Sequence, residues 1–289
     1  VYPYPKRSGF IKLGASRGLP RRAAKPVMLT PPEFRLINGR ELDAVPACLF
    51  KARSSAHARM LSQSDWLLRD KNDGAYLGTV CANSMHFFQR TSNARQRIEA
   101  VAELFAGSLQ AGQSRPTEDA ESILRQLDIE PGYYAEAHQL PLMAEPYVLE
   151  YAGKDRYQRP LWLEFSAKAA WLRMQKAGKL DNVHLQAISG YRSPLYQLGI
   201  FRRKMARGQS VAEILTVNAA PGCSEHHSGR ALDISAWGEP AAEVSFQLTH
   251  AYAWLRRFAA DFGFRLSYPQ DNPHGISFEP WHWYHAGSD

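Results

Sequence analysis

Two short segments near the C-terminus must meet in space if their polar residues are to act together. They are residues 224–233 (SEHHSGRALD) and residues 279–283 (EPWHW). Between them, His226, Asp233 and His282 offer two imidazoles and one carboxylate. Structural zinc sites usually have four protein ligands, whereas a three-ligand set leaves a position for water and is typical of a catalytic zinc site. The fold is therefore constrained to bring two separate segments to one point.

The spacing inside the first segment requires a bend in the chain. His226 and Asp233 are seven positions apart, and on a regular strand residues with an odd separation point to opposite faces. Ser228-Gly229 supplies the bend, because glycine adopts backbone conformations closed to other residues. We expect a short strand over residues 230–234 with Asp233 near its end. Ala231 shares the face of Asp233 and leaves room for a metal.

The second segment adds a candidate base. Glu279 lies three residues before His282, close enough to take a proton from a metal-activated water. The segment alternates in the manner of a strand, yet two residues three apart do not share a strand face. Pro280 removes a ladder hydrogen bond, and a kink there would turn Glu279 toward the water while His282 reaches the metal. The tryptophans that flank His282 are expected to be packing residues.

These residues match the pattern Ser-x-His-x-x-Gly-x-Ala-x-Asp followed by Glu-x-Trp-His. A third block, SGYRS at residues 189–193 with Tyr196-Gln197, precedes them in the chain. The three blocks, in this order, resemble those of the LAS metallopeptidases, and in particular of the VanY-like D-alanyl-D-alanine carboxypeptidases. The resemblance runs from about residue 127 to the C-terminus.

The resemblance implies a role for each matching residue. Glu279 acts as the general base and later as the proton donor. Arg192 holds the carboxylate at the end of the substrate, with Gln197 and Ser224 assisting, and a guanidinium suits this task because it pairs with a carboxylate through two hydrogen bonds. The cofactor is one zinc ion, Zn2+, and its ligands are His226, Asp233 and His282.

The implied activity is removal of the C-terminal D-alanine from peptidoglycan stem peptides, in the periplasm or outside the cell, with a leader peptide absent from this chain. Relatives instead cut L,D bonds or the internal L-alanyl-D-glutamate bond. Arg192 and Gln197 favour a free carboxylate at the cut end, and hence a carboxypeptidase. A different class, a binding module with a structural zinc, is disfavoured by Glu279, since a site without catalysis has little reason to keep a base.

Other reactive residues near these blocks are not expected to bind the metal. His227 follows a ligand and is expected to point away from the site. His274 and His285 are expected at its rim. Cys223 precedes Ser224 where relatives commonly carry an aromatic residue or Thr, and Tyr284-His285 stands where many carry Arg-Tyr. Both departures bear on the substrate pocket and leave the ligand set intact.

The formal net charge of +7 comes from one end of the chain. Residues 1–26 hold seven basic and no acidic side chains, and subtracting them from 35 leaves 28 basic against 28 acidic residues. The rest is therefore not a basic nucleic-acid-binding surface, and no nucleic acid is expected as a partner. The basic segment is interpreted as a solvated flexible arm or as a contact for acidic wall polymers, lipid or nucleic acid.

The remaining composition bounds the architecture. With 45% hydrophobic residues the chain can build a sizeable core, and no run approaches the length of a membrane span. We expect a basic arm (1–26), an N-terminal region of unknown role (27–115) and a zinc peptidase domain (116–289). Cys48 and Cys81 are either paired or reduced. The oligomeric state is left open.

Periodicity predicts an α+β fold, with a small antiparallel sheet that carries the zinc site, helices behind it and a helical or mixed N-terminal extension. The N-terminal helix is expected to have Asn93 as its cap. The predicted helices cover residues 94–112, 117–127, 165–176, 196–206 and 246–262, and the predicted strands cover residues 183–188, 230–234 and 264–268.

Overall fold

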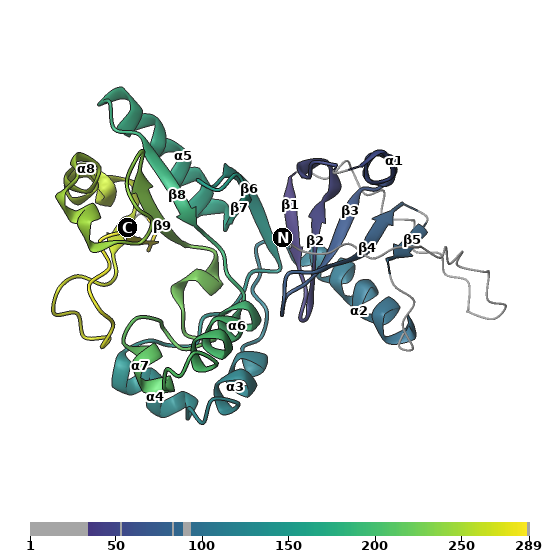
Figure 1. Cartoon of the computed structure of the whole chain (residues 1–289), viewed down its shortest axis with the longest axis horizontal. Coiled ribbons are helices and arrows are strands. Elements are labelled where there is room, and N and C mark those ends of the chain that lie inside the picture. The colour runs from purple at the N-terminus through teal and green to yellow at the C-terminus, as the bar shows by residue number, and fades with distance from the viewer. Residues whose placement is uncertain (1–33, 53, 83, 89–93, 288–289) are drawn as a thin grey trace. The chain divides into compact units, whose positions relative to one another are not determined.

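The structure is a computed structural model that describes residues 34–52, 54–82, 84–88 and 94–287 (Figure 1). The chain divides into two compact units, Val1–Leu109 and Gln110–Asp289. The basic segment 1–26 and the expected cap Asn93 lie outside the described residues. The three-part division made from the sequence stays a prediction.

The first unit is built on an antiparallel sheet with the strand order β5-β4-β3-β2-β1. The sequence did not predict this sheet, because its strands are short and do not share one alternating pattern. Helices α1 (Ser55–Ser62) and α2 (Ala94–Gly107) accompany it. The strands are β1 (Arg35–Asn38), β2 (Leu42–Pro46), β3 (Trp66–Asp70), β4 (Tyr76–Cys81) and β5 (Ser84–Phe87).

The core of the first unit lies between its sheet and α2. Val101 and Leu104 of α2 are buried against Ile37, Ala44 and Leu68 of the strands. The predicted helix 94–112 is thus present but shorter, since α2 ends at Gly107 and a 3-10 turn, Ser108–Gln110, follows.

The second unit contains a group of helices and a four-stranded sheet. Helices α3, α4, α6 and α7 bury their apolar faces in two adjoining clusters that include Leu124, Tyr134, Phe201 and Ile214. The bounds are α3 (Glu118–Arg125), α4 (Pro131–His138), α6 (Pro194–Met205) and α7 (Val211–Leu215). Serines at positions 193 and 210 cap α6 and α7 through their side chains, which explains where both helices begin.

The sheet of the second unit has the order β10-β11-β9-β8, and every neighbouring pair is antiparallel. A hairpin, β6 (Val148–Lys154) and β7 (Pro160–Leu163), precedes the long helix α5 (Phe165–Leu180). The sheet strands are β8 (Leu185–Ser189), β9 (Ala231–Ala236), β10 (Phe264–Leu266) and β11 (His282–His285), and α8 (His250–Phe258) lies between β9 and β10 in the sequence.

One face of this sheet forms the main core. Leu232 and Ile234 of β9 and Trp283 of β11 are buried with Trp171 of α5 and Leu255 of α8. Because side chains alternate along a strand, Asp233 and His282 point to the opposite face. The mixed α+β class and the small antiparallel sheet backed by helices are confirmed.

The predicted helix over residues 246–262 is wrong as a single element. A 3-10 segment, Val244–Leu248, comes first, and α8 starts only after Thr249. Thr249 has an extended backbone, and its hydroxyl accepts a hydrogen bond from the Tyr252 N–H at 3.1 Å. The apolar spacing continues through this point, but the cap starts a new helix. A second 3-10 turn, Ala259–Phe262, ends the run at Gly263.

The strand bounds also shift. The predicted strand 230–234 runs as β9 from Ala231 to Ala236, so Asp233 lies in its middle and not near its end. The predicted strand 264–268 is shortened to β10. None of the helices in the described parts of the chain is both long and apolar enough to cross a bilayer.

Candidate metal centre

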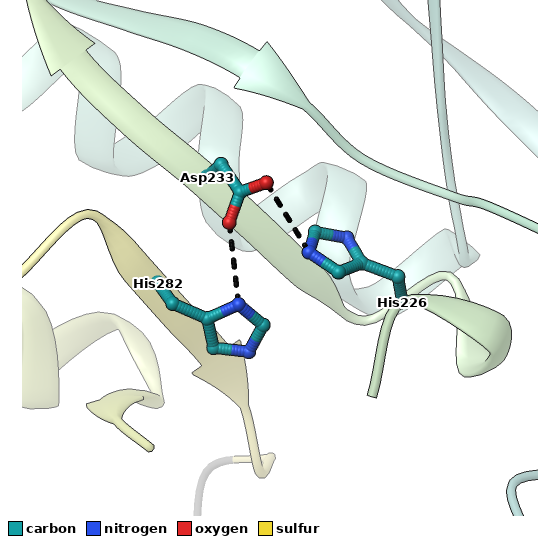
Figure 2. Close-up of side chains that lie close together, drawn as sticks. All are labelled: His226, Asp233 and His282. Carbon is teal, nitrogen blue, oxygen red and sulfur yellow. Dashed lines mark hydrogen bonds and ion pairs between the residues drawn. The ribbon is translucent and has the colours of Figure 1, made fainter. Parts of the chain in front are cut away.

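The polar face of the four-stranded sheet brings three buried side chains together (Figure 2). The imidazole Nε2 of His226 lies 3.3 Å from Oδ2 of Asp233, and Nδ1 of His282 lies 3.2 Å from Oδ1 of the same carboxylate. One ligand atom from each residue falls within 4.8 Å of the others. Among the described residues, no other group of His, Cys, Asp and Glu comes together in this way.

Strand pairing fixes two of the three residues. Asp233 of β9 and His282 of β11 are direct partners in the antiparallel ladder. Opposite residues of paired strands point to the same face, so the register alone places this carboxylate beside this imidazole.

His226 arrives from a different kind of element. It lies on a 3-10 helix, Glu225–Ser228, that ends at Gly229. Gly229 has a left-handed backbone with φ of 68° and leads directly into β9. A side chain at this position would overlap Leu149 and come within 3.0 Å of the Glu164 nitrogen. The bend predicted at Ser228-Gly229 is therefore present, and glycine is required there.

Hydrogen bonds on the outer nitrogens set which nitrogen of each imidazole faces the cluster. The Nδ1–H of His226 donates to the carbonyl of Gly190 at 2.7 Å, which directs Nε2 toward Asp233. The Nε2 of His282 lies 2.9 Å from Oε2 of Glu225 and donates to it, which directs Nδ1 toward Asp233. This arrangement is typical of metal-binding histidines, whose second nitrogen donates to a carbonyl or a carboxylate.

The charges of the cluster are strongly coupled. Burial lowers the pKa of His226, so this imidazole is neutral. Burial opposes ionisation of Asp233, but the charged imidazole of His282 outweighs it and holds the pKa of Asp233 well below its usual range. Burial likewise opposes protonation of His282, yet Asp233 and Glu225 raise the pKa of His282 to about 10.

Glu279 lies beside the cluster and has a shifted pKa of its own. Its Oε2 is 3.8 Å from Nδ1 of His282, and 15% of its side chain is exposed. A backbone hydrogen bond turns the chain between the two residues. The His282 N–H donates to the Glu279 carbonyl at 3.1 Å where β11 begins. Burial, together with the nearby charge of Asp233, raises the pKa of Glu279 to about 7. A carboxylate with such a pKa can accept and return a proton near neutral pH.

Two of the three predicted substrate-binding residues are joined. Nη1 of Arg192 donates to Oε1 of Gln197 at 3.0 Å, and the amide nitrogen of Gln197 donates to the Ala219 carbonyl at 3.0 Å. Nη2 of Arg192 lies 3.5 Å from Oδ2 of Asp233, so the guanidinium reaches the edge of the metal cluster. Ser224 is buried at the start of the 3-10 helix, and its hydroxyl does not cap that helix.

The segments that carry Arg192 and His226 are linked directly. The Arg192 N–H donates to the His226 carbonyl at 3.2 Å. The Nδ1–H of His227 donates to the Arg192 carbonyl at 2.6 Å, and its Nε2 accepts from the Gly222 N–H at 2.9 Å. Burial lowers the pKa of His227 to about 4, so it is neutral. His227 therefore supports the site and points away from the ligand cluster.

The other expectations have mixed outcomes. His285 is buried against Phe264, so its expected place at the rim is wrong. His274 is partly buried, and its Nδ1–H donates to the His138 carbonyl at 2.8 Å. Cys223 is buried, lies outside the ligand group, and has a pKa that burial raises to about 12. All three cysteines are free, so Cys48 and Cys81 do not pair.

Sequence reasoning missed two polar residues around the cluster. Glu225, next to the candidate ligand His226, holds the outer nitrogen of His282. Ser189, the first residue of the SGYRS block, donates from its hydroxyl to Oδ2 of Asp233 at 2.6 Å. Glu225 carried no signal in the sequence, because its burial and its partner 57 positions away appear only in the structure. Ser189 carried none, because a β-bulge between Ala187 and Ser189 produces its pairing with Asp233.

The donors fit a zinc ion in type and in spacing. Zinc takes imidazole nitrogen and carboxylate oxygen at about 2.1 Å, which separates neighbouring donors by about 3.4 Å in a tetrahedron. The separations of 3.2 and 3.3 Å run from the two different oxygens of Asp233, and one donor atom from each residue lies within 4.8 Å of the others, so the three donors are close enough to converge on one ion. Each of the two imidazoles already directs one nitrogen into the cluster, so no ring has to turn.

Comparison with known proteins finds a family that this part of the chain resembles. Residues 160–288 match the family model described as VanY, D-alanyl-D-alanine carboxypeptidase. The D-alanyl-D-alanine carboxypeptidase of Enterococcus faecalis is 36% identical over 121 residues, which are 38% of this chain and 43% of that protein. The chain thus spans less than half of that relative. The VanY family model thus covers the three residues of the cluster and a little under half of the chain.

Two solved structures are also similar over part of the chain. The LdcB LD-carboxypeptidase is 27% identical with a TM-score of 0.45, covering 47% of this chain and 66% of its own. The VanY D,D-pentapeptidase of a VanB-type resistance cassette, solved as a mutant in complex with Zn(II), is 28% identical with a TM-score of 0.40. That match covers 48% of this chain and 79% of the other.

Proposed function

We propose that this protein is a zinc-dependent carboxypeptidase that removes the C-terminal D-alanine from peptidoglycan stem peptides. The observation that carries the proposal is the buried cluster of two imidazoles and one carboxylate with Glu279 beside it. The VanY domain at residues 160–288 supports the reaction class. Because stem peptides lie in the cell envelope, the protein is proposed to act in the periplasm or outside the cell.

His226, Asp233 and His282 would hold the zinc ion. When bound, zinc supplies Lewis acidity, which polarises a carbonyl and lowers the pKa of a water molecule from 15.7 to about 7. Glu279 takes the proton from that water as it attacks the scissile carbonyl. The same carboxylate then passes the proton to the leaving amine. The raised pKa of Glu279 suits both steps, since a base that works near neutral pH must also give its proton back.

Arg192 would select the end of the peptide. Its side chain is 18% exposed, and its guanidinium reaches the edge of the cluster and is held by Gln197 and Ser189. A guanidinium with fixed orientation pairs with a terminal carboxylate through two hydrogen bonds. Placing that pair next to the metal sets the scissile bond one residue from the chain end. Gln197 positions Arg192, and Ser224 is proposed to assist from the start of the 3-10 helix.

The test is mass spectrometry of a muropeptide that ends in D-Ala-D-Ala, incubated with the zinc-loaded protein and with Glu279→Ala. Loss of one alanine with the native protein only is the expected result. Glu279→Ala should still bind zinc, because it removes a base and none of the three ligands. Near-native turnover by this variant would overturn the role of Glu279.

The same experiment separates the other candidates. Loss of alanine from a tetrapeptide would indicate an L,D-carboxypeptidase. Release of a peptide that starts with D-glutamate, with L-alanine left on the sugar, would indicate an L-alanyl-D-glutamate endopeptidase. Zinc binding without cleavage of any substrate would indicate a binding module with a structural metal. Glu279 is the observation against that last candidate, since a base beside a three-ligand site has no structural task there.

A further inference from the structure

Glu225 is a buried carboxylate that the proposed reaction does not use. Its side chain is 5% exposed, and both of its oxygens are engaged. Oε2 accepts from Nε2 of His282 at 2.9 Å, and Oε1 accepts from Nη2 of Arg265 at 3.0 Å. A buried charge is costly unless it has partners. A carboxylate kept at this place therefore has a task that a neutral side chain would not fulfil.

We propose that Glu225 is a positioning residue that fixes the tautomer and orientation of His282, so that its Nδ1 faces the metal. This inference rests on the proposed zinc site and adds a residue to it. A histidine ring has two nitrogens, and only one of them can face Asp233 and His226. Glu225 accepts the proton of Nε2 and thereby leaves Nδ1 as the donor atom for the metal.

The two histidines of the cluster are fixed in different ways. His226 is held by the main-chain carbonyl of Gly190, an acceptor present with any side chain. His282 is held by a side-chain carboxylate, which substitution can remove. A carboxylate acceptor also draws the ring proton more strongly than a carbonyl, and this makes the opposite nitrogen a better donor to a cation.

The position of Glu225 in the chain explains how its side chain contacts His282. Glu225 and His226 are consecutive residues of one 3-10 helix, in which neighbouring side chains diverge by about 120°. His226 therefore enters the cluster while Glu225 passes to the far nitrogen of His282. The two rings lie edge to face, with centroids 4.9 Å apart. One short helix thus supplies one ligand and the support of another.

Arg265 completes the arrangement on its outer side. It lies on β10, directly paired with Tyr284 of β11, and its guanidinium stacks over that ring at 5.1 Å. The Arg265 side chain is 54% exposed, so the positive charge that balances Glu225 lies at the protein surface. Asp233, His282, Glu225 and Arg265 form a line of alternating charge from the cluster to the surface.

The test measures zinc affinity by competition with a chelating dye in the full chain and in Glu225→Ala, Glu225→Gln and Glu164→Gln. Glu225→Ala should bind zinc about 10- to 100-fold more weakly than the native protein. Glu225→Gln keeps an acceptor oxygen for the Nε2 proton and should recover most of that loss. Glu164 is a partly buried carboxylate that caps α5, and Glu164→Gln should leave zinc affinity unchanged.

A second measurement reads the tautomer directly. Nitrogen-15 NMR of the zinc-loaded native protein should show His282 with a protected Nε2 proton and a metal-bound Nδ1. Glu225→Ala should lose that protection. If Glu225→Ala does not fold, the same spectrum of Glu225→Gln gives the answer, since its Nε2 proton should exchange faster than in the native protein.

The outcomes separate the inference from the proposed function. Native zinc affinity together with an unchanged His282 spectrum in the Glu225 variants would overturn the role of Glu225 and leave the zinc enzyme standing. Failure of the native protein to bind one zinc ion would overturn the proposed function itself.

Discussion

Asp233 of β9 and His282 of β11 are directly opposed in one antiparallel strand pair, with Oδ1 and Nδ1 3.2 Å apart. Two of the three candidate ligands are therefore set by backbone register. A slip of one residue would turn one of them into the core face occupied by Leu232 and Trp283. The hydrophobic pattern that builds the core thus also protects the metal cluster.

Zinc binding should release about one proton at pH 7.5. The pKa of His282 is raised to about 10, so its imidazole is charged in the metal-free protein, and Nδ1 must lose its proton to bind a cation. Calorimetric titration with zinc in buffers of different ionisation enthalpy measures the number released. Heats that do not depend on the buffer would contradict the prediction.

Ionisation of Glu279 should lower the stability of the metal-free protein as pH rises from about 4.5 to 7. Glu279 has a folded-state pKa of about 7 against 4.5, so the folded chain keeps a proton that the unfolded chain releases. Ionisation therefore favours unfolding across this window, by an amount on the order of 3 kcal/mol. Urea unfolding with a chelator, at several pH values, should show the native protein losing stability relative to Glu279→Gln across this window, because the opposite contributions of His226 and His227 are common to both proteins.

His282 should extend the same trend to higher pH. Its folded-state pKa is raised from 6.5 to about 10, so its contribution is fully present below pH 6.5 and is lost as pH rises toward 10. This part of the slope should remain in Glu279→Gln. Its absence from that variant would show that His282 is not held by two ionised carboxylates.

Arg192→Met should reduce activity selectively on substrates that have a free C-terminal carboxylate. Arg192→Met removes a charged hydrogen-bonding partner of the substrate carboxylate and should lower kcat/KM for a free-acid peptide by about 10- to 100-fold. For the same peptide with an amidated C-terminus, the native protein and Arg192→Met should have similar kcat/KM values. Equal losses on both substrates would argue against the carboxylate role.

Gly229→Ala should destabilise the fold more than Gly238→Ala. Both glycines have a left-handed backbone, with φ of 68° and 85°. An added methyl at Gly229 meets Leu149 and the Glu164 nitrogen, whereas nothing lies within 4 Å at Gly238. Gly238→Ala should cost about 1–2 kcal/mol for the backbone alone, and Gly229→Ala should exceed that. Urea unfolding measures the loss of stability in each variant. Equal losses would contradict the close contact of Gly229 with Leu149 and the Glu164 nitrogen.

His227→Leu should destabilise the fold by about 2–5 kcal/mol. The substitution leaves the Gly222 N–H and the Arg192 carbonyl without their partner in a buried region. The exposed His184 provides the control, since His184→Leu should change the free energy of unfolding by less than about 0.5 kcal/mol. Similar values for the two variants would show that His227 has no structural role.

The sequence predicted the candidate metal ligands better than the residues that hold those ligands in place. His226, Asp233 and His282 could be chosen because zinc chemistry restricts the residue types. Glu225 could not, because its task depends on the far side of a ring 57 positions away. The long helix over 246–262 failed because a capping threonine outweighs apolar spacing. The strands of residues 35–87 are too short for periodicity to show.

The link between Arg192 and His226 has a consequence for how such a site changes over evolutionary time. The acceptors that hold His226 and His227 are the main-chain carbonyls of Gly190 and Arg192, and these atoms remain when a side chain is replaced. Residue 192 is therefore free to vary in what it recognises without loosening the neighbouring ligand. Substrate preference can change at this position while the main-chain support of His226 and His227 stays in place.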